Sequence, residues 1–163
     1  MKKLLLLAFL ALLLHNGDAQ VLYFKGEWTA LNKAELFTGI FKVQIKKDSR
    51  VKGELLWTFL ATDNTNSDLR DHYKGKKGKR GIEFVEGIFT RETNDIFWEG
   101  KTKYDPADIL GLDKYYLKLS ADKKVLYGKT DYNGTGNGMF YALRVSAATA
   151  RQTLAAAKRS LKK

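Results

Sequence analysis

The segments Leu36–Lys46 (LFTGIFKVQIK) and Val51–Ala61 (VKGELLWTFLA) indicate the fold class of this chain. In both segments apolar side chains recur at every second position, as Leu55 and Trp57 illustrate. This period of two is typical of a β-strand that buries one face. The polar residues Asp48–Arg50 between the segments form a turn signal. The two segments therefore predict an antiparallel hairpin.

Six more strand candidates flank this hairpin. They are Tyr23–Leu31, Gly81–Thr90, Ile96–Lys103, Tyr115–Ser120, Val125–Tyr132 and Gly138–Val145. Most of them contain one glycine, which marks the bends that a closing sheet needs. Eight antiparallel strands suffice for a small barrel. We therefore predict an all-β fold, an eight-stranded antiparallel meander that closes into a barrel over residues 20–145.

A β-sandwich is the alternative fold, because several strands are apolar on both faces, as in Leu55–Trp57 and Ile96–Trp98. A barrel with such strands needs a helix or a partner over part of its outer surface. Residues 146–163 form a basic, Ala-rich segment without Gly or Pro, in which Ala150, Leu154 and Ala157 recur at helical spacing. This spacing predicts a C-terminal helix.

Residues 1–19 have the order of a secretory signal peptide. Lys2 and Lys3 precede an uninterrupted apolar run at 4–14, and a short polar segment then ends at Ala19. Eleven apolar residues are too few to cross a bilayer as a helix. We therefore expect cleavage after Ala19 and a secreted or periplasmic protein without a transmembrane span.

The composition excludes several kinds of chemistry. The 163 residues include no Cys, which excludes disulfides, a thiol nucleophile and Cys-ligated metals. After the signal segment the sole histidine is His72, in a polar loop, and no hydrolase or nucleotide-binding motif is present. We expect the strand glutamates, Glu83 included, to face outward, and Asp105 and Asp113 to serve turns rather than a metal. These features predict a non-enzymatic protein without a cofactor or metal.

Aromatic residues provide the candidate binding site. Several share one face of the predicted strands, which suggests a barrel interior that encloses a small apolar or amphipathic ligand. We expect tyrosine hydroxyls near the mouth to orient that ligand. The candidate ligand-binding residues are Phe37, Phe41, Trp57, Phe59, Trp98, Tyr116, Tyr127 and Tyr141.

Basic residues provide the alternative function. The formal net charge is +11, and positive charges cluster in the loop at 74–80 and in the C-terminal segment. Such clusters favour an anionic polymer, membrane surface or partner protein, although nothing indicates sequence-specific nucleic-acid binding. The candidate anion-binding residues are Lys74, Lys76, Lys77, Lys79, Arg80, Arg151, Lys158 and Arg159.

Three short motifs support the barrel. Gly26–Trp28 (GEW), Thr130–Tyr132 (TDY) and Arg144 stand in the order of the three-part signature of lipocalins, which the chain resembles. The resemblance implies a ligand-binding barrel with a helix on its outside, in which Trp28 lies at the closed end beneath Arg144.

A second resemblance covers more of the chain. The segments VEGIF at 85–89, GLDKYYLKLS at 111–120 and LYGKTDYNGTGNG at 126–138 are similar to those of small uncharacterised exported bacterial β-rich domains. That resemblance implies a fold and no activity. The sequence thus predicts an exported barrel that holds a small ligand, with anionic-surface binding as the alternative.

Overall fold

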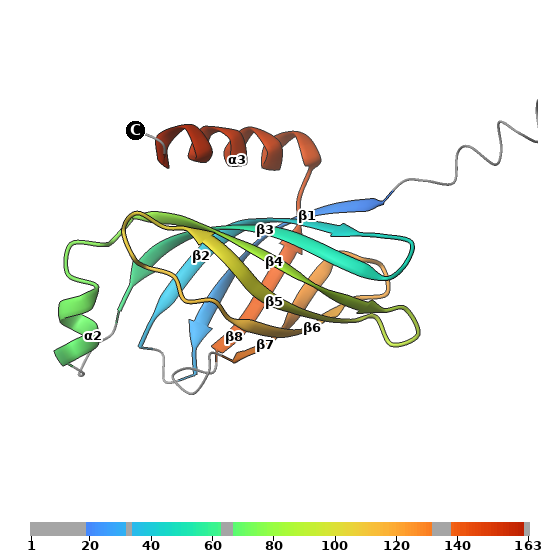
Figure 1. The fold of residues 1–163 in the computed structure, drawn as a ribbon, viewed down its shortest axis with the longest axis horizontal. Helices are drawn as coiled ribbons and strands as arrows, with labels where there is room; N and C mark the ends of the chain where they lie inside the picture. The colour runs from blue at the N-terminus through green and yellow to red at the C-terminus, as the bar shows by residue number, and fades with distance from the viewer. Residues whose placement is uncertain (1–18, 32–33, 63–66, 132–137, 162–163) are drawn as a thin grey trace, which may run out of the picture.

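The computed structural model describes residues 19–31, 34–62, 67–131 and 138–161, and within them eight antiparallel strands close into a barrel (Figure 1). The strands are β1 Gln20–Ala30, β2 Leu36–Ile45, β3 Arg50–Ala61, β4 Arg80–Thr90, β5 Asp95–Tyr104, β6 Lys114–Leu119, β7 Val125–Asp131 and β8 Gly138–Arg144. Each strand pairs with its neighbours in sequence, and β8 pairs with β1. The predicted meander is confirmed. The expected signal peptide lies outside the described residues.

The seam between β1 and β8 closes the barrel, and a glycine permits the close approach there. Trp28 is opposite Phe140, and Gly26 is opposite Ala142. A Cβ atom on Gly26 would collide with the backbone of β8, at the carbonyl oxygen of Tyr141 and at Ala142. Because backbone cannot move aside as a side chain can, this position requires glycine.

The two ends of the barrel differ in their connections. At one end β2–β3, β4–β5 and β6–β7 are joined by turns at 46–49, 91–94 and 120–124. At the other end most of the connections are longer, and the one between β3 and β4 carries the short helix α2 (Ser67–His72) (Figure 1). We call this second end the loop end. The candidate site lies there.

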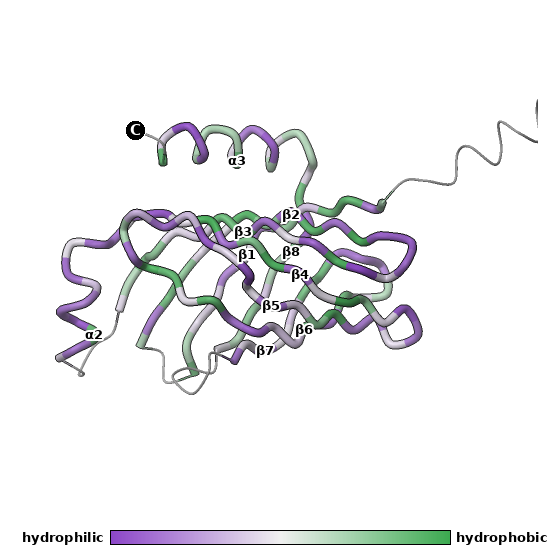
Figure 2. The backbone as a smooth tube through the Cα atoms, in the orientation of Figure 1, coloured by the Kyte–Doolittle hydropathy of each residue, from purple (hydrophilic) through white to green (hydrophobic). Residues whose placement is uncertain are grey.

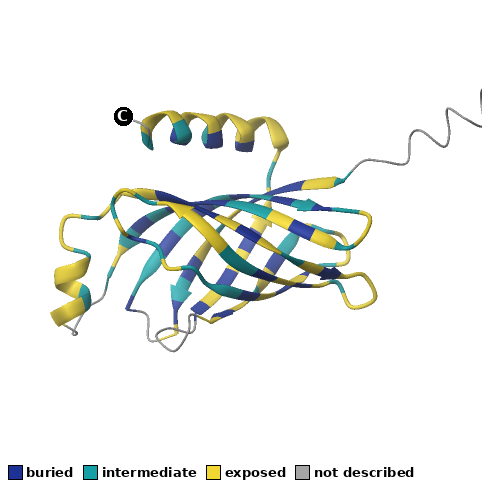
Figure 3. Cartoon of the chain, in the orientation of Figure 1, coloured by how far each residue is buried: buried dark blue, intermediate teal, exposed yellow. Residues whose placement is uncertain are grey.

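Aromatic rings fill the middle of the barrel. Along the strands, buried residues alternate with more exposed ones (Figure 3), and hydrophobic residues alternate with hydrophilic ones (Figure 2). The ring of Phe41 lies 4.6 Å from that of Trp57 and 5.0 Å from that of Phe140. Such tilted contacts are favourable beyond the area that they bury. The interior away from the loop end is therefore a packed core.

The C-terminal helix α3 (Ala147–Leu161) lies on the outside of the barrel (Figure 1). Its buried residues Ala150, Leu154 and Ala157 belong to a second apolar cluster, which is separate from the barrel core. The barrel contributes outward-facing side chains of β1, β3 and β4 to this cluster, namely Tyr23, Leu56 and Ile82. The helix thus explains why these strands are apolar on both faces, and the sandwich alternative is wrong.

Both ends of α3 are anchored to their surroundings. At its start the Ser146 hydroxyl accepts a hydrogen bond from the Thr149 amide at 3.2 Å, which is the role of a helix N-cap. At its end the Tyr104 hydroxyl donates to the Leu161 carbonyl at 2.7 Å. The last turn of α3 therefore lies beside the end of β5, at the loop end. Within the described part of the chain, neither helix is long and apolar enough to span a membrane.

The expected packing of Arg144 over Trp28 is wrong. The register places Arg144 opposite Phe24, four residues along β1 from Trp28, which is about 13 Å of strand. The indole of Trp28 points away from Arg144 and lies against Gly138. A Cβ atom added to Gly138 would collide with this ring. Trp28 also lines a cavity at the loop end, so it does not lie at a closed end of the barrel.

Candidate functional site

A cavity of about 420 Å³ opens at the loop end of the barrel. Strand residues form its inner part, and three connections complete it: Glu35 before β2, the α2 region, and the segment at 108–113 between β5 and β6. Small-molecule sites typically occupy 300–1,000 Å³ and combine apolar walls with a few polar groups. The cavity therefore has the size of a site for one small molecule.

Aromatic side chains form one wall of this cavity. Phe37 contacts Trp28 with ring centroids 5.6 Å apart and Trp57 with centroids 6.3 Å apart. Tyr73, which follows α2, stacks on Phe59 at 4.4 Å and so ties the long loop to the barrel. The Trp28 indole is held in place by a 2.6 Å hydrogen bond that it donates to the Thr130 hydroxyl.

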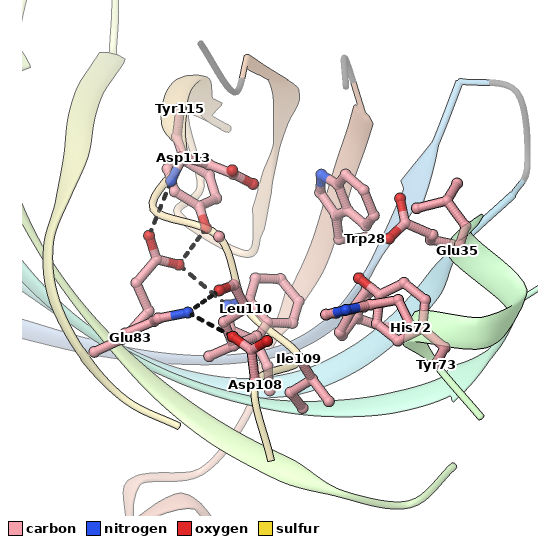
Figure 4. Close-up of a pocket in the computed structure, with 15 residues that line it drawn as sticks. Trp28, Glu35, His72, Tyr73, Glu83, Asp108, Ile109, Leu110, Asp113 and Tyr115 are labelled. Carbon is pink, nitrogen blue, oxygen red and sulfur yellow. Dashed lines mark hydrogen bonds and ion pairs between the residues drawn. The ribbon is translucent and has the colours of Figure 1, made fainter. Parts of the chain in front are cut away.

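A buried carboxyl group, Glu83, occupies the opposite wall (Figure 4). It is 1% exposed. Its Oε2 accepts a hydrogen bond from the Tyr115 hydroxyl at 2.5 Å and a longer one from the Trp57 indole at 3.4 Å. Its Oε1 accepts one from the backbone amide of Asp113 at 3.3 Å. Glu83 therefore links β3, β4 and β6 at the base of the cavity.

Burial raises the pKa values of two carboxyl groups here. The pKa of Glu83 rises to about 8, chiefly through desolvation, although the hydrogen bonds from Tyr115 and Trp57 oppose the rise. The pKa of Asp113 rises to about 7, through desolvation and then through the nearby carboxylates Glu35 and Asp131. Both groups therefore carry protons for part of the time near neutral pH.

Glu35 and Tyr73 form a pair on the far side of Trp28 from Asp113 (Figure 4). Burial raises the pKa of Tyr73, and its hydrogen bond to Glu35 adds to the rise. The Tyr73 hydroxyl therefore stays protonated and donates to the Glu35 carboxylate. Polar groups thus lie on both sides of the Trp28 ring.

The predicted aromatic residues divide between the cavity and the core. Phe37 and Trp57 line the cavity. Phe41, Phe59 and Trp98 are at most 2% exposed and belong to the barrel core, so they are not among the lining residues. Phe41 contacts Trp57 and Phe59 contacts Phe37, so these two rings support the aromatic wall, whereas Trp98 contacts Tyr115.

The three tyrosines expected to orient a ligand at the mouth of the barrel do not line the cavity, so that prediction is wrong. Tyr116, Tyr127 and Tyr141 are 53%, 43% and 54% exposed and lie on the outer face of the barrel. The cause is strand phase, because residues at successive positions point to opposite faces. Tyr115, one position before Tyr116, faces inward and supplies the hydroxyl that reaches Glu83.

The outward orientation expected for Glu83 is also wrong, whereas the turn role of Asp105 is confirmed. Glu86, three residues from Glu83, does face outward and pairs with Lys52 at 2.5 Å. The Asp105 carboxylate accepts hydrogen bonds from the amides of Ile109 and Leu110 at 2.8 and 2.7 Å. The described residues contain no group of three side chains that could hold a metal ion.

Several of the predicted anion-binding residues have partners within the protein. Arg151 donates to the Tyr23 hydroxyl at 3.1 Å and lies over its ring. Lys158 pairs with Glu54 at 2.6 Å, and Lys76 donates to the carbonyl of Asp108 at 2.9 Å. The others are exposed: Lys74, Lys77, Lys79, Arg80 and Arg159.

No protein-family model matches the chain, and neither a curated protein nor a solved structure matches it. The eight-stranded antiparallel barrel with an outer helix agrees with the architecture that the lipocalin resemblance implies. The function must therefore be inferred from the site itself.

Proposed function

We propose that this protein is an exported, non-enzymatic barrel that binds one small amphipathic molecule in the cavity at the loop end. The observation that carries the proposal is the contrast between the packed middle of the barrel and the cavity of about 420 Å³ above it. A barrel whose only task is structural has no need of such a space, because filling it would add stability.

The walls of the cavity favour an amphipathic ligand over a purely apolar one. Trp28, Phe37 and Trp57 offer apolar and aromatic surface to the body of the ligand. Glu83, Tyr115 and Asp113 offer hydrogen-bonding groups at the opposite wall. A few polar groups in an apolar setting are the usual means by which a site orients a small molecule.

Partly filling the cavity should weaken ligand binding. We expect an apolar fluorophore to bind saturably at one site and to quench tryptophan fluorescence, because Trp28 and Trp57 line the cavity. Leu69, on α2, is half-buried and also lines it. Leu69→Trp should fill part of the space and weaken binding by at least tenfold, as measured by fluorescence titration.

The matched control is Asp71→Trp, which places the same bulk on an exposed position of α2 outside the lining. It should leave the fluorophore affinity within twofold of the starting value. Equal affinities of the Leu69→Trp and Asp71→Trp proteins would contradict this location of the site.

Attachment to an anionic surface is the second candidate function. The exposed Lys74, Lys77 and Lys79 lie in the loop that follows α2, and Arg159 lies on the last turn of α3. The hydrogen bond between Tyr104 and Leu161 places that turn at the same end of the barrel. Both basic clusters thus gather at the loop end, which supports a single anionic contact surface.

Replacing Lys74, Lys77, Lys79 and Arg159 together by glutamine should lower the salt concentration that elutes the protein from immobilised heparin. Exposed cations bind polyanions by releasing counterions, so retention depends on how many of them share one surface. The control replaces four exposed lysines away from that end, Lys25, Lys47, Lys118 and Lys124. Equal shifts for the two proteins would show that only net charge matters.

A further inference from the structure

We propose that the cavity selects ligands in which a protonated amine is joined to an apolar or aromatic body. This inference rests on the proposed function, since it names the chemical class that the same cavity accepts. It is carried by the carboxyl groups that face the cavity, by the aromatic ring between Glu35 and Asp113, and by the scarcity of free cations among the described residues around them.

Carboxyl groups outnumber basic groups in the lining. The titratable and charged residues that face the cavity are Glu35, His72, Tyr73, Glu83, Lys103, Asp108, Asp113 and Tyr115. Lys103 is already engaged, because its ammonium group lies 3.5 Å from both Asp105 and Asp108 and also donates to the carbonyl of Leu110. Glu35, Glu83 and Asp113 have no ion pair among the described residues.

The surroundings of Asp113 show the same imbalance. Among the described residues, the influences on the pKa of Asp113 act in one direction: burial, Glu35 and Asp131 all raise it. Within the part of the chain that the structure describes, no lysine or arginine lowers the pKa of Asp113. A cation placed beside Asp113 would supply the missing opposite charge in a partly buried setting, where a charge interaction is strong.

The Trp28 ring is placed to receive that cation. Its indole lies between Glu35 and Asp113 and lines the cavity (Figure 4). An ammonium group over the face of tryptophan is attracted electrostatically by the negative face of the ring. Two carboxylates flanking an aromatic ring therefore form a receptor for an amine, while Phe37 and Trp57 accommodate the apolar body.

The local charge of the cavity is opposite to that of the whole molecule. The chain has a formal net charge of +11, which by itself would favour anionic ligands. Among the described residues, the cavity lining has four carboxyl groups against one lysine, and that lysine is paired. Because charges within a few ångströms outweigh screened charges on the outer surface, the cavity itself should prefer a cation.

A series of three indoles of nearly equal size tests the inference. Tryptamine carries an ammonium group, 3-ethylindole is neutral, and indole-3-propionate carries a carboxylate. Isothermal titration calorimetry at pH 7.5 should show tryptamine binding at least tenfold more tightly than either of the others. Equal affinities, or tighter binding of another member of the series, would overturn the inference.

Substitutions of residues that line the cavity identify the groups that cause the preference for an amine. Glu35→Gln and Asp113→Asn should each weaken tryptamine binding at least fivefold and leave the affinity for 3-ethylindole within twofold. Glu86→Gln, on the outer wall, removes a carboxylate of similar charge and should change neither affinity. A loss of affinity that is the same for tryptamine and 3-ethylindole would show a structural role and overturn the amine assignment.

Proton release gives an independent readout. A bound ammonium group favours the ionised forms of Asp113 and Glu83, so tryptamine should expel protons that the empty cavity holds at pH 7.5. The binding heat should then differ between phosphate and Tris buffers, which have different ionisation enthalpies. Identical heats in the two buffers would contradict the inference.

The outcomes separate the two proposals. If none of the indoles binds while an apolar fluorophore does, the amine inference fails and the binding function stands. If the fluorophore does not bind either, the proposed function itself fails.

Discussion

Glu83→Gln should remove a pH-dependent loss of stability that the unmodified protein shows between about pH 4.5 and 8. In the folded state the pKa of Glu83 is raised from 4.5 to about 8 by burial. Between these values the unfolded chain releases a proton that the folded protein retains, so unfolding becomes easier as the pH rises. The contribution of Glu83 to the free energy of unfolding is fully present below pH 4.5 and is lost by about pH 8.

Each pH unit within this window should lower the free energy of unfolding by about 1.4 kcal/mol through Glu83 alone. Asp113 adds a contribution of the same sign between pH 3.8 and about 7. Glutamine cannot ionise, so the variant should retain only the smaller slope that comes from Asp113 and the remaining groups. Urea unfolding monitored by circular dichroism at pH 5, 6, 7 and 8 measures both slopes.

Glu86→Gln is the control, because this residue lies three positions away on the exposed face of the same strand. Its pKa is lowered by the hydrogen bond from Lys52, so its effect on the pH dependence has the opposite sign. The control should keep the fall in stability between pH 4.5 and 8. A Glu83→Gln protein with the same slope as the control would show that Glu83 is ionised throughout this range.

The strands could be predicted from the sequence because their signals are local. Alternation along Leu36–Ile45 and the turn residues at 46–49 lie within a few positions of one another. The short connections then allow little besides a meander. The C-terminal helix was also predictable, since Ala150, Leu154 and Ala157 share one helical face and all three are buried.

Strand phase limited the prediction of the site. In β4 both faces are apolar, because Ile82 lies beneath α3 while Val85 faces the core, so periodicity alone does not orient Glu83. In β6 the inward face could have been determined from the sequence. Leu117 and Leu119 face inward, and Tyr115 lies an even number of residues before them, so it faces the same way. The same test would have assigned Tyr116 to the outer surface.

The assembly of the cavity depends on contacts between residues far apart in the sequence. Glu35 precedes β2, Tyr73 follows α2 and Asp113 precedes β6. No local sequence pattern links these three residues. In a meander, however, alternate connections lie at the same end of the sheet. Closure of the barrel then brings these three connections around one opening, where residues of different charge and size form a single site.

The second large effect should come from Leu154→Asp, which ought to detach α3 and leave the barrel folded. Leu154 is 6% exposed and packs in the apolar cluster that joins α3 to Tyr23, Leu56 and Ile82. Removing a buried leucine costs about 2–5 kcal/mol, so the equilibrium constant for docking α3 on the barrel should fall by about thirtyfold or more. The barrel has its own core, which shares no residue with this cluster.

Hydrogen exchange measured by mass spectrometry tests this separation between helix and barrel. In the Leu154→Asp protein the amides of α3 should exchange at least tenfold faster, while those of the paired strands stay protected. Ala155→Asp introduces the same charge one position further along, at an exposed site of the helix, and should leave α3 protected. Equal protection of α3 in the two variants would contradict the docking role of Leu154. Loss of strand protection in the Leu154→Asp protein would instead show that the barrel depends on its helix to stay closed.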